Sequence, residues 1–208
     1  MKNLPPELAN VDIYDREEIL QVDVLGRSPG LLMNNPAYML DEKKGIRKVT
    51  QKGSTVEVEA ERSAYKTADG ELYIPSEAIF RSLINAGTYI KSGKSSLKSF
   101  VSAGIRIFPR EIRLGTSEYK IDLRTVVIQH ARIVKARASI PEWKARFYVF
   151  YDPSIFVTDV KRNVSAIDLI SEALGYAGQR IGILDFRPQH LGEFGRFVIS
   201  GIKELDEE

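Results

Sequence analysis

The residues best suited to chemistry lie near the end of the chain, in residues 178–197. This stretch, GQRIGILDFRPQHLGEFGRF, holds four glycines, three arginines and one of the two histidines. Arginine carries a planar fork of donors that matches phosphate oxygens, and glycine adopts positive φ angles or lets another backbone approach. We expect a binding loop for an extended polyanion, formed by Arg180, Gly182, Arg187, His190, Gly192, Gly195 and Arg196. The alternative is a long surface loop whose glycines only turn the chain.

Positive charge gathers in the middle of the chain. Residues 91–146 contain 13 Lys and Arg against 4 Asp and Glu, although the net charge of the whole chain is only +2. A basic segment between acidic ends favours a polyanion partner, and the alternative is a solvated basic face without a partner. We expect phosphate contacts from Lys91, Lys94, Lys98, Arg132, Lys135, Arg137, Lys144 and Arg146.

The serine-rich segment KSGKSSLK, residues 91–98, ends like a nucleotide-binding phosphate loop. The spacing from Gly87 to Gly93 is one residue too long, and the segment follows a predicted helix instead of a strand. The sequence therefore argues against a nucleotide hydrolase and favours a loop that contacts phosphate.

Periodicity predicts the elements that must position these residues. Residues 19–25 alternate as a strand, the region 74–91 predicts a helix capped by Ser76, and residues 165–177 predict a helix with a capping box from Ser165 to Asp168. Further strands are expected at 106–114, 124–140 (with a bulge at 133–134), 144–151 and 196–202, and 54–61 alternates like an isolated strand.

With its insertions set aside, the chain reads strand, helix, strand, strand, helix, strand. This order predicts an α+β, ferredoxin-like (RRM-like) βαββαβ core, a four-stranded antiparallel sheet with both helices on one face. The open face of such a sheet is the surface that RNA-recognition domains use. We expect one domain over 1–208, with an insertion at 38–72 and a basic loop and hairpin region at 91–151.

The predicted strand 144–151 alternates between two kinds of face. Lys144, Arg146 and Tyr148 share one side, which offers charge for phosphates and a ring for bases. We expect Tyr148 and Trp143 to stack on or wedge between bases. A solvent-facing hairpin with ordinary charges is the alternative.

Composition limits the class of protein. The chain is 43% hydrophobic and has no cysteine, which indicates a packed core without disulfides or thiolate metal sites. With two histidines as well, a transition-metal site is not expected, and we expect no cofactor. An acidic, proline-broken N-terminus and the lack of a long apolar run predict a soluble, cytoplasmic protein without membrane contact.

Two motifs resemble the RAMP superfamily of CRISPR effector subunits, particularly the backbone proteins that line a guide RNA. YIPSEAIFRSLINAG is similar to the family's "IPgSsLkGalR" segment, with Ser76, Arg81 and Gly87 at its polar and small positions. IGILDFRPQHLGEFGRF resembles the family's glycine-rich loop, between the second helix and the last strand. The long insertion and the basic hairpin resemble the family's RNA-gripping elaborations.

The resemblance implies a non-catalytic protein that binds the backbone of single-stranded guide RNA without reading its sequence. It implies a repeated subunit of a ribonucleoprotein in a prokaryotic cell, with copies of itself head-to-tail, other effector subunits, and target DNA or RNA as partners. A phage or plasmid relative is also consistent with the motifs.

Two alternatives stay open. One is a metal-independent endoribonuclease of the same superfamily, for which the resemblance suggests His130 or His190 as the acid or base. Some backbone subunits of that superfamily cut target RNA with a loop aspartate, for which Asp41, Asp69 or Asp185 is the candidate by position. The other is a virion or assembly protein whose basic band binds an acidic partner.

Overall fold

The protein is described here by a computed structural model, which covers residues 4–36, 40–41, 45–46, 55–128, 131–156 and 164–205 of the 208-residue chain. In this part of the chain, antiparallel sheets and four α-helices confirm the predicted α+β class. No described helix is both long enough and apolar enough to cross a membrane.

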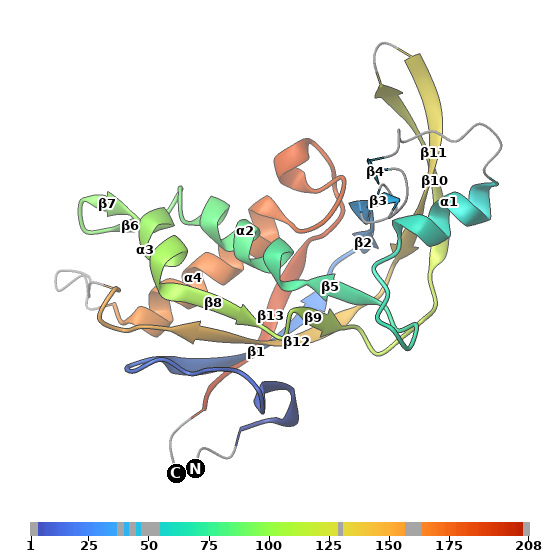
Figure 1. The fold of residues 1–208 in the computed structure, drawn as a ribbon. Helices are drawn as coiled ribbons and strands as arrows, with labels where there is room; N and C mark the ends of the chain where they lie inside the picture. The colour runs from blue at the N-terminus through green and yellow to red at the C-terminus, as the bar shows by residue number, and fades with distance from the viewer. Residues whose placement is uncertain are drawn as a thin grey trace.

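A four-stranded antiparallel sheet forms the centre of the molecule, in the spatial order β13-β1-β12-β8. Helix α2 lies in the chain between β1 and β8, and α4 between β12 and β13, so each helix links two strands that are separated by one other strand. Both helices cover the same face of the sheet (Figure 1). The bounds are β1 Glu18–Gly26, α2 Ser76–Ala86, β8 Ile105–Phe108, β12 Lys144–Tyr151, α4 Ala166–Tyr176 and β13 Phe197–Glu204.

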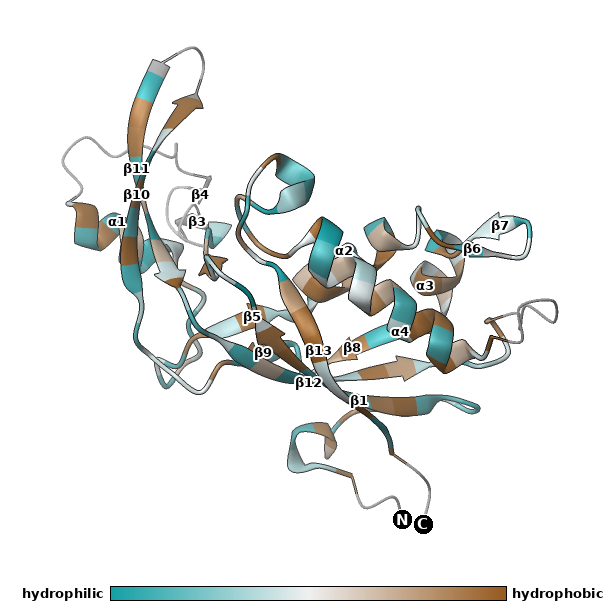
Figure 2. Cartoon of the chain, turned by 180° about the vertical axis from the view of Figure 1, so that it is seen from behind, coloured by the Kyte–Doolittle hydropathy of each residue, from teal (hydrophilic) through white to brown (hydrophobic). Residues whose placement is uncertain are grey.

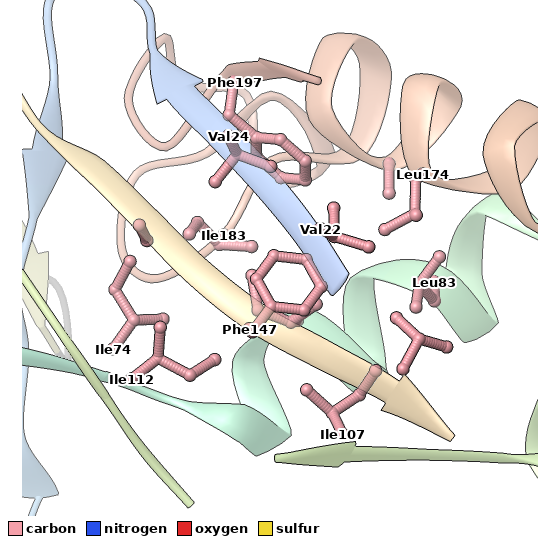
Figure 3. Close-up of a cluster of buried hydrophobic side chains, with 14 of the residues drawn as sticks. Val22, Val24, Ile74, Leu83, Ile107, Ile112, Phe147, Leu174, Ile183 and Phe197 are labelled. Carbon is pink, nitrogen blue, oxygen red and sulfur yellow. The ribbon is translucent and has the colours of Figure 1, made fainter. Parts of the chain in front are cut away.

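The main core lies between this sheet and its helices. Alternation places Val22 and Val24 of β1 and Phe147 of β12 on the helix side, where all three are buried. Leu83 of α2 and Leu174 of α4 point toward them (Figure 3). Figure 2 shows hydrophobic segments in the strands of the central sheet and both hydrophilic and hydrophobic segments along α2.

The two core helices begin differently. Ser165 and Asp168 form the predicted capping box of α4, because the Ser165 hydroxyl accepts from Asp168 N and the Asp168 carboxylate accepts from Ser165 N. The predicted cap at Ser76 is wrong, since Ser76 is the first helical residue, is buried, and makes no capping bond.

A long hairpin replaces the single bulged strand predicted at 124–140. Strands β10 (Lys120–Ile128) and β11 (Ala131–Ile140) pair in one unbroken register, from Lys120 opposite Ser139 to Ile128 opposite Ala131. The bulge predicted at 133–134 is therefore wrong, because Ile133 and Val134 pair with Val126 and Thr125 in that register. The hairpin projects from the body (Figure 1) and exposes four large apolar side chains, Ile121, Leu123, Val127 and Val134.

The isolated strand predicted at 54–61 is also wrong, because this segment forms helix α1 (Val56–Ser63). Thr55 caps the helix by accepting from Val58 N. Glu59 Oε2 accepts from Ala136 N at 3.0 Å and Ser63 Oγ accepts from Ala138 N at 2.7 Å, so the helix satisfies backbone donors of β11. Contacts from a distant strand thus override the local Val/Glu alternation.

Short elements complete the fold. Pro109 divides the strand predicted at 106–114 into β8 and β9 (Glu111–Arg113), and β9 pairs with β5 (Tyr73–Pro75). The predicted loop at 91–98 is a small hairpin, β6 (Lys91–Ser92) and β7 (Ser95–Ser96), that leads into α3 (Lys98–Gly104). The remaining elements are η1 Pro6–Leu8, β2 Leu31–Leu32, β3 Leu40–Asp41, β4 Gly45–Ile46, η3 Ala177–Ile181 and η4 Pro188–His190.

The sheet face opposite the helices is not open as predicted. The N-terminal strap, defined as residues 4–14, packs on it, and Leu8 of the strap is buried against Ile19, Tyr148 and Phe150. The strap lies below the sheet in Figure 1, on the side away from α2 and α4.

Candidate nucleic-acid interface

The glycine- and arginine-rich loop, residues 178–197, is compact. Other atoms of the protein occupy the space beside its glycines. A Cβ at Gly195 would overlap the carbonyl oxygen of Ile183, and a Cβ at Gly192 would overlap the carbonyl oxygen of Phe186. Gly182 has φ +74°, and a Cβ there would lie 2.7 Å from Pro188 Cδ. The predicted approach of a ligand backbone at Gly182, Gly192 and Gly195 is therefore corrected: these glycines permit close packing within the loop.

Backbone hydrogen bonds tie the loop to the segment that follows β1. Gly195 N donates to Gly30 O at 2.8 Å, and Asp185 N donates to Leu32 O at 3.1 Å. Ile183 N donates to Gly195 O at 3.0 Å, which brings the two halves of the loop together. The loop is thus a fixed platform beside the amino end of α2.

A hollow of about 440 Å³ lies between this platform and the amino end of α2. Its lining includes Arg81 of α2, Arg187 and Asp185 of the loop, and Asn34 and Tyr65. Arg81 is exposed, while Arg187 Nη1 donates to Leu184 O at 2.7 Å, which fixes the guanidinium at the rim. Burial lowers the pKa of Arg187. Two guanidinium groups at one opening are suited to phosphate oxygens, and the carboxylates of Glu77 and Asp185 share the lining with them.

A buried ion pair joins the platform to the projecting hairpin. Arg137 Nε lies 2.7 Å from Asp185 Oδ2, and only 9% of the Arg137 side chain is exposed. Lys135 Nζ donates to Asn34 Oδ1 at 2.9 Å, and burial, followed by the charge of Arg137, lowers the pKa of Lys135. Since Lys135 and Arg137 are buried, their predicted phosphate contacts are corrected to a structural role.

The hairpin also contacts the loop through a side chain that sequence reasoning missed. The Arg124 guanidinium lies 4.8 Å from the ring centre of Phe194 and 5.3 Å from that of Phe186. In the sequence, Arg124 is one of several cations in a basic segment. Nothing near it in the sequence predicts a contact with aromatic rings more than sixty residues later. Arg81 was visible in the α2 motif, but only the fold brings it to Arg187.

The two predicted base-stacking rings are buried. Trp143 is 7% exposed, and its indole lies over Gly26, where a Cβ would overlap it, and 6.3 Å from the ring of Phe197. Tyr148 is 3% exposed, under the strap. Neither ring offers a face to a base in this conformation, so the predicted stacking is corrected for Trp143 and, while the strap covers it, for Tyr148.

The other predicted contacts are spread over the molecule. Lys144 and Arg146 are exposed on β12, on the side away from the helices, where Arg146 Nε pairs with Asp23 Oδ1 at 2.7 Å. Arg132 is exposed on β11, in the long hairpin. Figures 1 and 2 both show this β10–β11 hairpin and the β6–β7 hairpin at opposite ends of the molecule. At the β6–β7 end, the predicted contacts Lys91, Lys94 and Lys98 are all exposed. Arg180 is exposed after α4, and Arg196 Nη1 donates to Gln179 O.

The candidate catalytic groups do not meet in the described residues. His190 Nε2 lies 3.1 Å from Arg187 Nη2 at the rim of the loop. Asp185 holds Arg137, and Asp69 accepts from Arg113 Nη1 at 2.8 Å, a bond that lowers the pKa of Asp69 to about 2. His130 and the side chain of Asp41 lie outside the described residues. Within the described part, no three His, Asp or Glu side chains are placed to hold a metal ion.

Comparison with known proteins gives a likeness of fold. No family model matches the sequence, and no curated protein matches it. Among solved structures, a chain of the "Type III-B Cmr-beta bound to cognate target RNA" is similar, with a TM-score of 0.52 and 12% sequence identity. The alignment covers 92% of this chain and 61% of that one, so this chain spans about three fifths of the neighbour's length.

Proposed function

We propose that this chain is a non-catalytic, RAMP-like subunit of a CRISPR-type ribonucleoprotein that binds the backbone of single-stranded guide RNA without reading its sequence. The observation that carries the proposal is the hollow between α2 and the loop, which both Arg81 and Arg187 line. Guanidinium groups contact phosphate oxygens, which are the same in every nucleotide. The structural likeness to a chain of an RNA-bound CRISPR complex supports an RNA partner and further effector subunits.

The architecture supports a single domain of ferredoxin-like type. The strand order β13-β1-β12-β8, with α2 and α4 on one face, agrees with a βαββαβ core. One hydrophobic cluster joins β1, β12, α2 and α4. The segments 38–72 and 91–151 are then elaborations around this core.

A non-catalytic role is supported by the partners of the candidate aspartates. Asp69 and Asp185 each hold an arginine, so both carboxylates already have a structural use. General acid–base cleavage needs a second group positioned on the leaving oxygen. The candidate His190 has the guanidinium of Arg187 as its neighbour.

The dependence of RNA affinity on salt tests the proposal. We expect a log–log slope of about −0.7 for each phosphate that is neutralised, and Arg81→Ala or Arg187→Gln should reduce the slope by about one phosphate for every RNA sequence. Fluorescence anisotropy of a labelled oligonucleotide at several salt concentrations measures it. Lys203→Ala, an exposed cation on β13, is the control and should leave the slope unchanged. An affinity that does not respond to salt would contradict the proposal.

We also propose that several copies bind one strand head-to-tail, since a small footprint gives weak binding that neighbours reinforce through effective concentration. The acidic residues of α1 are a poor candidate for this contact, because Glu59 accepts from Ala136 N and Glu61 accepts from Lys66 Nζ and Tyr119 Oη. Light scattering should show large assemblies on a long single strand and monomers without it. One protein per long strand at saturation would rule out the repeated arrangement.

A further inference from the structure

Three aromatic rings and one arginine lie together on the sheet face that the strap covers. In the β8–β12 pair, Tyr148 is opposite Phe108, and Phe150 is opposite Arg106. Directly opposed residues of an antiparallel pair share a face and lie side by side. The four side chains therefore form one continuous patch, on the side of the sheet away from α2 and α4.

The strap, residues 4–14, is held over this patch almost entirely by side chains. Leu8 is fully buried, and Leu4, Val11 and Ile13 pack around it. Among the described residues, no backbone–backbone hydrogen bond joins the strap to the sheet, and the bonds of Leu8, Ala9 and Val11 N stay within the strap. Release of the strap would therefore break no backbone hydrogen bond of the sheet.

Arg106 is the main polar attachment of the strap. Its Nη2 donates to Asp12 O at 2.8 Å, and its guanidinium stacks 4.0 Å from the ring centre of Tyr14. The same guanidinium pairs with Glu17, just beyond the strap. Arg106, a residue of the covered patch, therefore donates to a backbone oxygen of the strap that covers it.

A second group of arginines meets the strap at its edge. Glu7 of the strap lines a hollow of about 550 Å³ together with Arg110, Arg113, Arg146 and Tyr148. Glu111 also lines this hollow, and its three arginines have carboxylate partners: Glu77 for Arg110, Asp69 and Glu71 for Arg113, and Asp23 for Arg146. The strap thus places a carboxylate in the lining of a hollow that three arginines share, and a backbone oxygen on a fourth arginine, Arg106.

We propose that this face is a second binding site, for single-stranded nucleic acid, and that the strap occupies it as an acidic substitute which the strand displaces. Rings on neighbouring strands of a sheet stack unpaired bases, and arginines beside them hold the phosphates. Phe108, Tyr148 and Phe150 supply the rings, and Arg106, Arg110 and Arg146 supply the charge. The site lies across the sheet from the hollow at Arg81 and Arg187, and it does not depend on the function proposed above.

Releasing the strap tests the site. Leu8→Gln removes the buried anchor without changing charge, and Asn10→Gln, at an exposed position of the same segment, is the matched control. Both are made in an Arg81→Ala background, so that the other site contributes less. If the strap is closed in about nine molecules of ten, its release should tighten the binding of an oligouridylate of about 8 nucleotides roughly tenfold. Anisotropy measures the affinity, and limited proteolysis within residues 4–14 reports the release.

Two further measurements test whether the nucleic acid binds on the sheet face that the strap covers. Adding Arg146→Ala to Leu8→Gln should remove most of the gain, and ultraviolet crosslinks should move onto Phe108, Tyr148 or Phe150 only when the strap is free. Should Leu8→Gln unfold the chain, Tyr14→Ala takes its place, because Tyr14 is 60% exposed and stacks on Arg106. A released strap with unchanged affinity overturns the proposal. So does equal binding of polyglutamate, which would mark a surface for an acidic protein.

Discussion

A Gly195→Val substitution is expected to destabilise the folded chain by about 4 kcal/mol or more. Gly195 has φ +73°, a region that valine avoids, and its Cβ would overlap the carbonyl oxygen of Ile183. Both backbone partners of Gly195 would have to move, because its nitrogen binds Gly30 and its carbonyl binds Ile183. The free energy of unfolding in urea, followed by circular dichroism, measures the loss.

Gly175→Ala is the matched control. Gly175 lies within α4, and no atom lies within 4 Å of the position that its Cβ would take. Alanine there should stabilise the helix by about 0.5–1 kcal/mol. If Gly195→Val kept the stability of the native protein and lost only RNA affinity, the glycine would serve the ligand and not the loop.

Asp185→Ala is expected to cost about 3–5 kcal/mol, because it leaves the guanidinium of Arg137 buried without its partner. Arg137 is 9% exposed at its side chain and Asp185 is 26% exposed, so solvent screens the pair little. The pair also joins the loop to β11, so the hairpin should lose protection from hydrogen exchange together with the loop. Urea unfolding gives the energy, and exchange gives its location.

The double variant Arg137→Met/Asp185→Leu should recover most of this stability, because well-packed apolar residues replace a buried pair at little cost. Asp69→Ala removes the partner of an exposed arginine, Arg113, and should change the free energy little. Equal losses for Asp185→Ala and Asp69→Ala would show that burial of Arg137 does not set the cost.

The core could be predicted from sequence because its signals are local. Alternation in residues 19–25 and 144–151 identifies β1 and β12, and the capping box identifies α4. Helix α1 could not be predicted, since Ser63 and Glu59 bind β11, which comes more than seventy residues later.

The site was harder to predict than the core, for a related physical reason. A glycine in the sequence shows that space or a positive φ is needed, but not whether protein or ligand fills the space. At Gly192 and Gly195 the neighbour is the loop's own backbone. The alternation of β12 placed Tyr148 on the correct face, but only the fold shows that Leu8, from a distant part of the sequence, covers it.

The outer strand of the projecting hairpin has a consequence for handling the protein. Strand β10 lies at the edge of its three-stranded sheet, and Ile121, Leu123 and Val127 are exposed along its nine residues. A long apolar edge is a template on which other chains add strands and aggregate. The charges of Lys120, Asp122 and Arg124 alternate with apolar residues along the first half of that edge, and so they favour solubility.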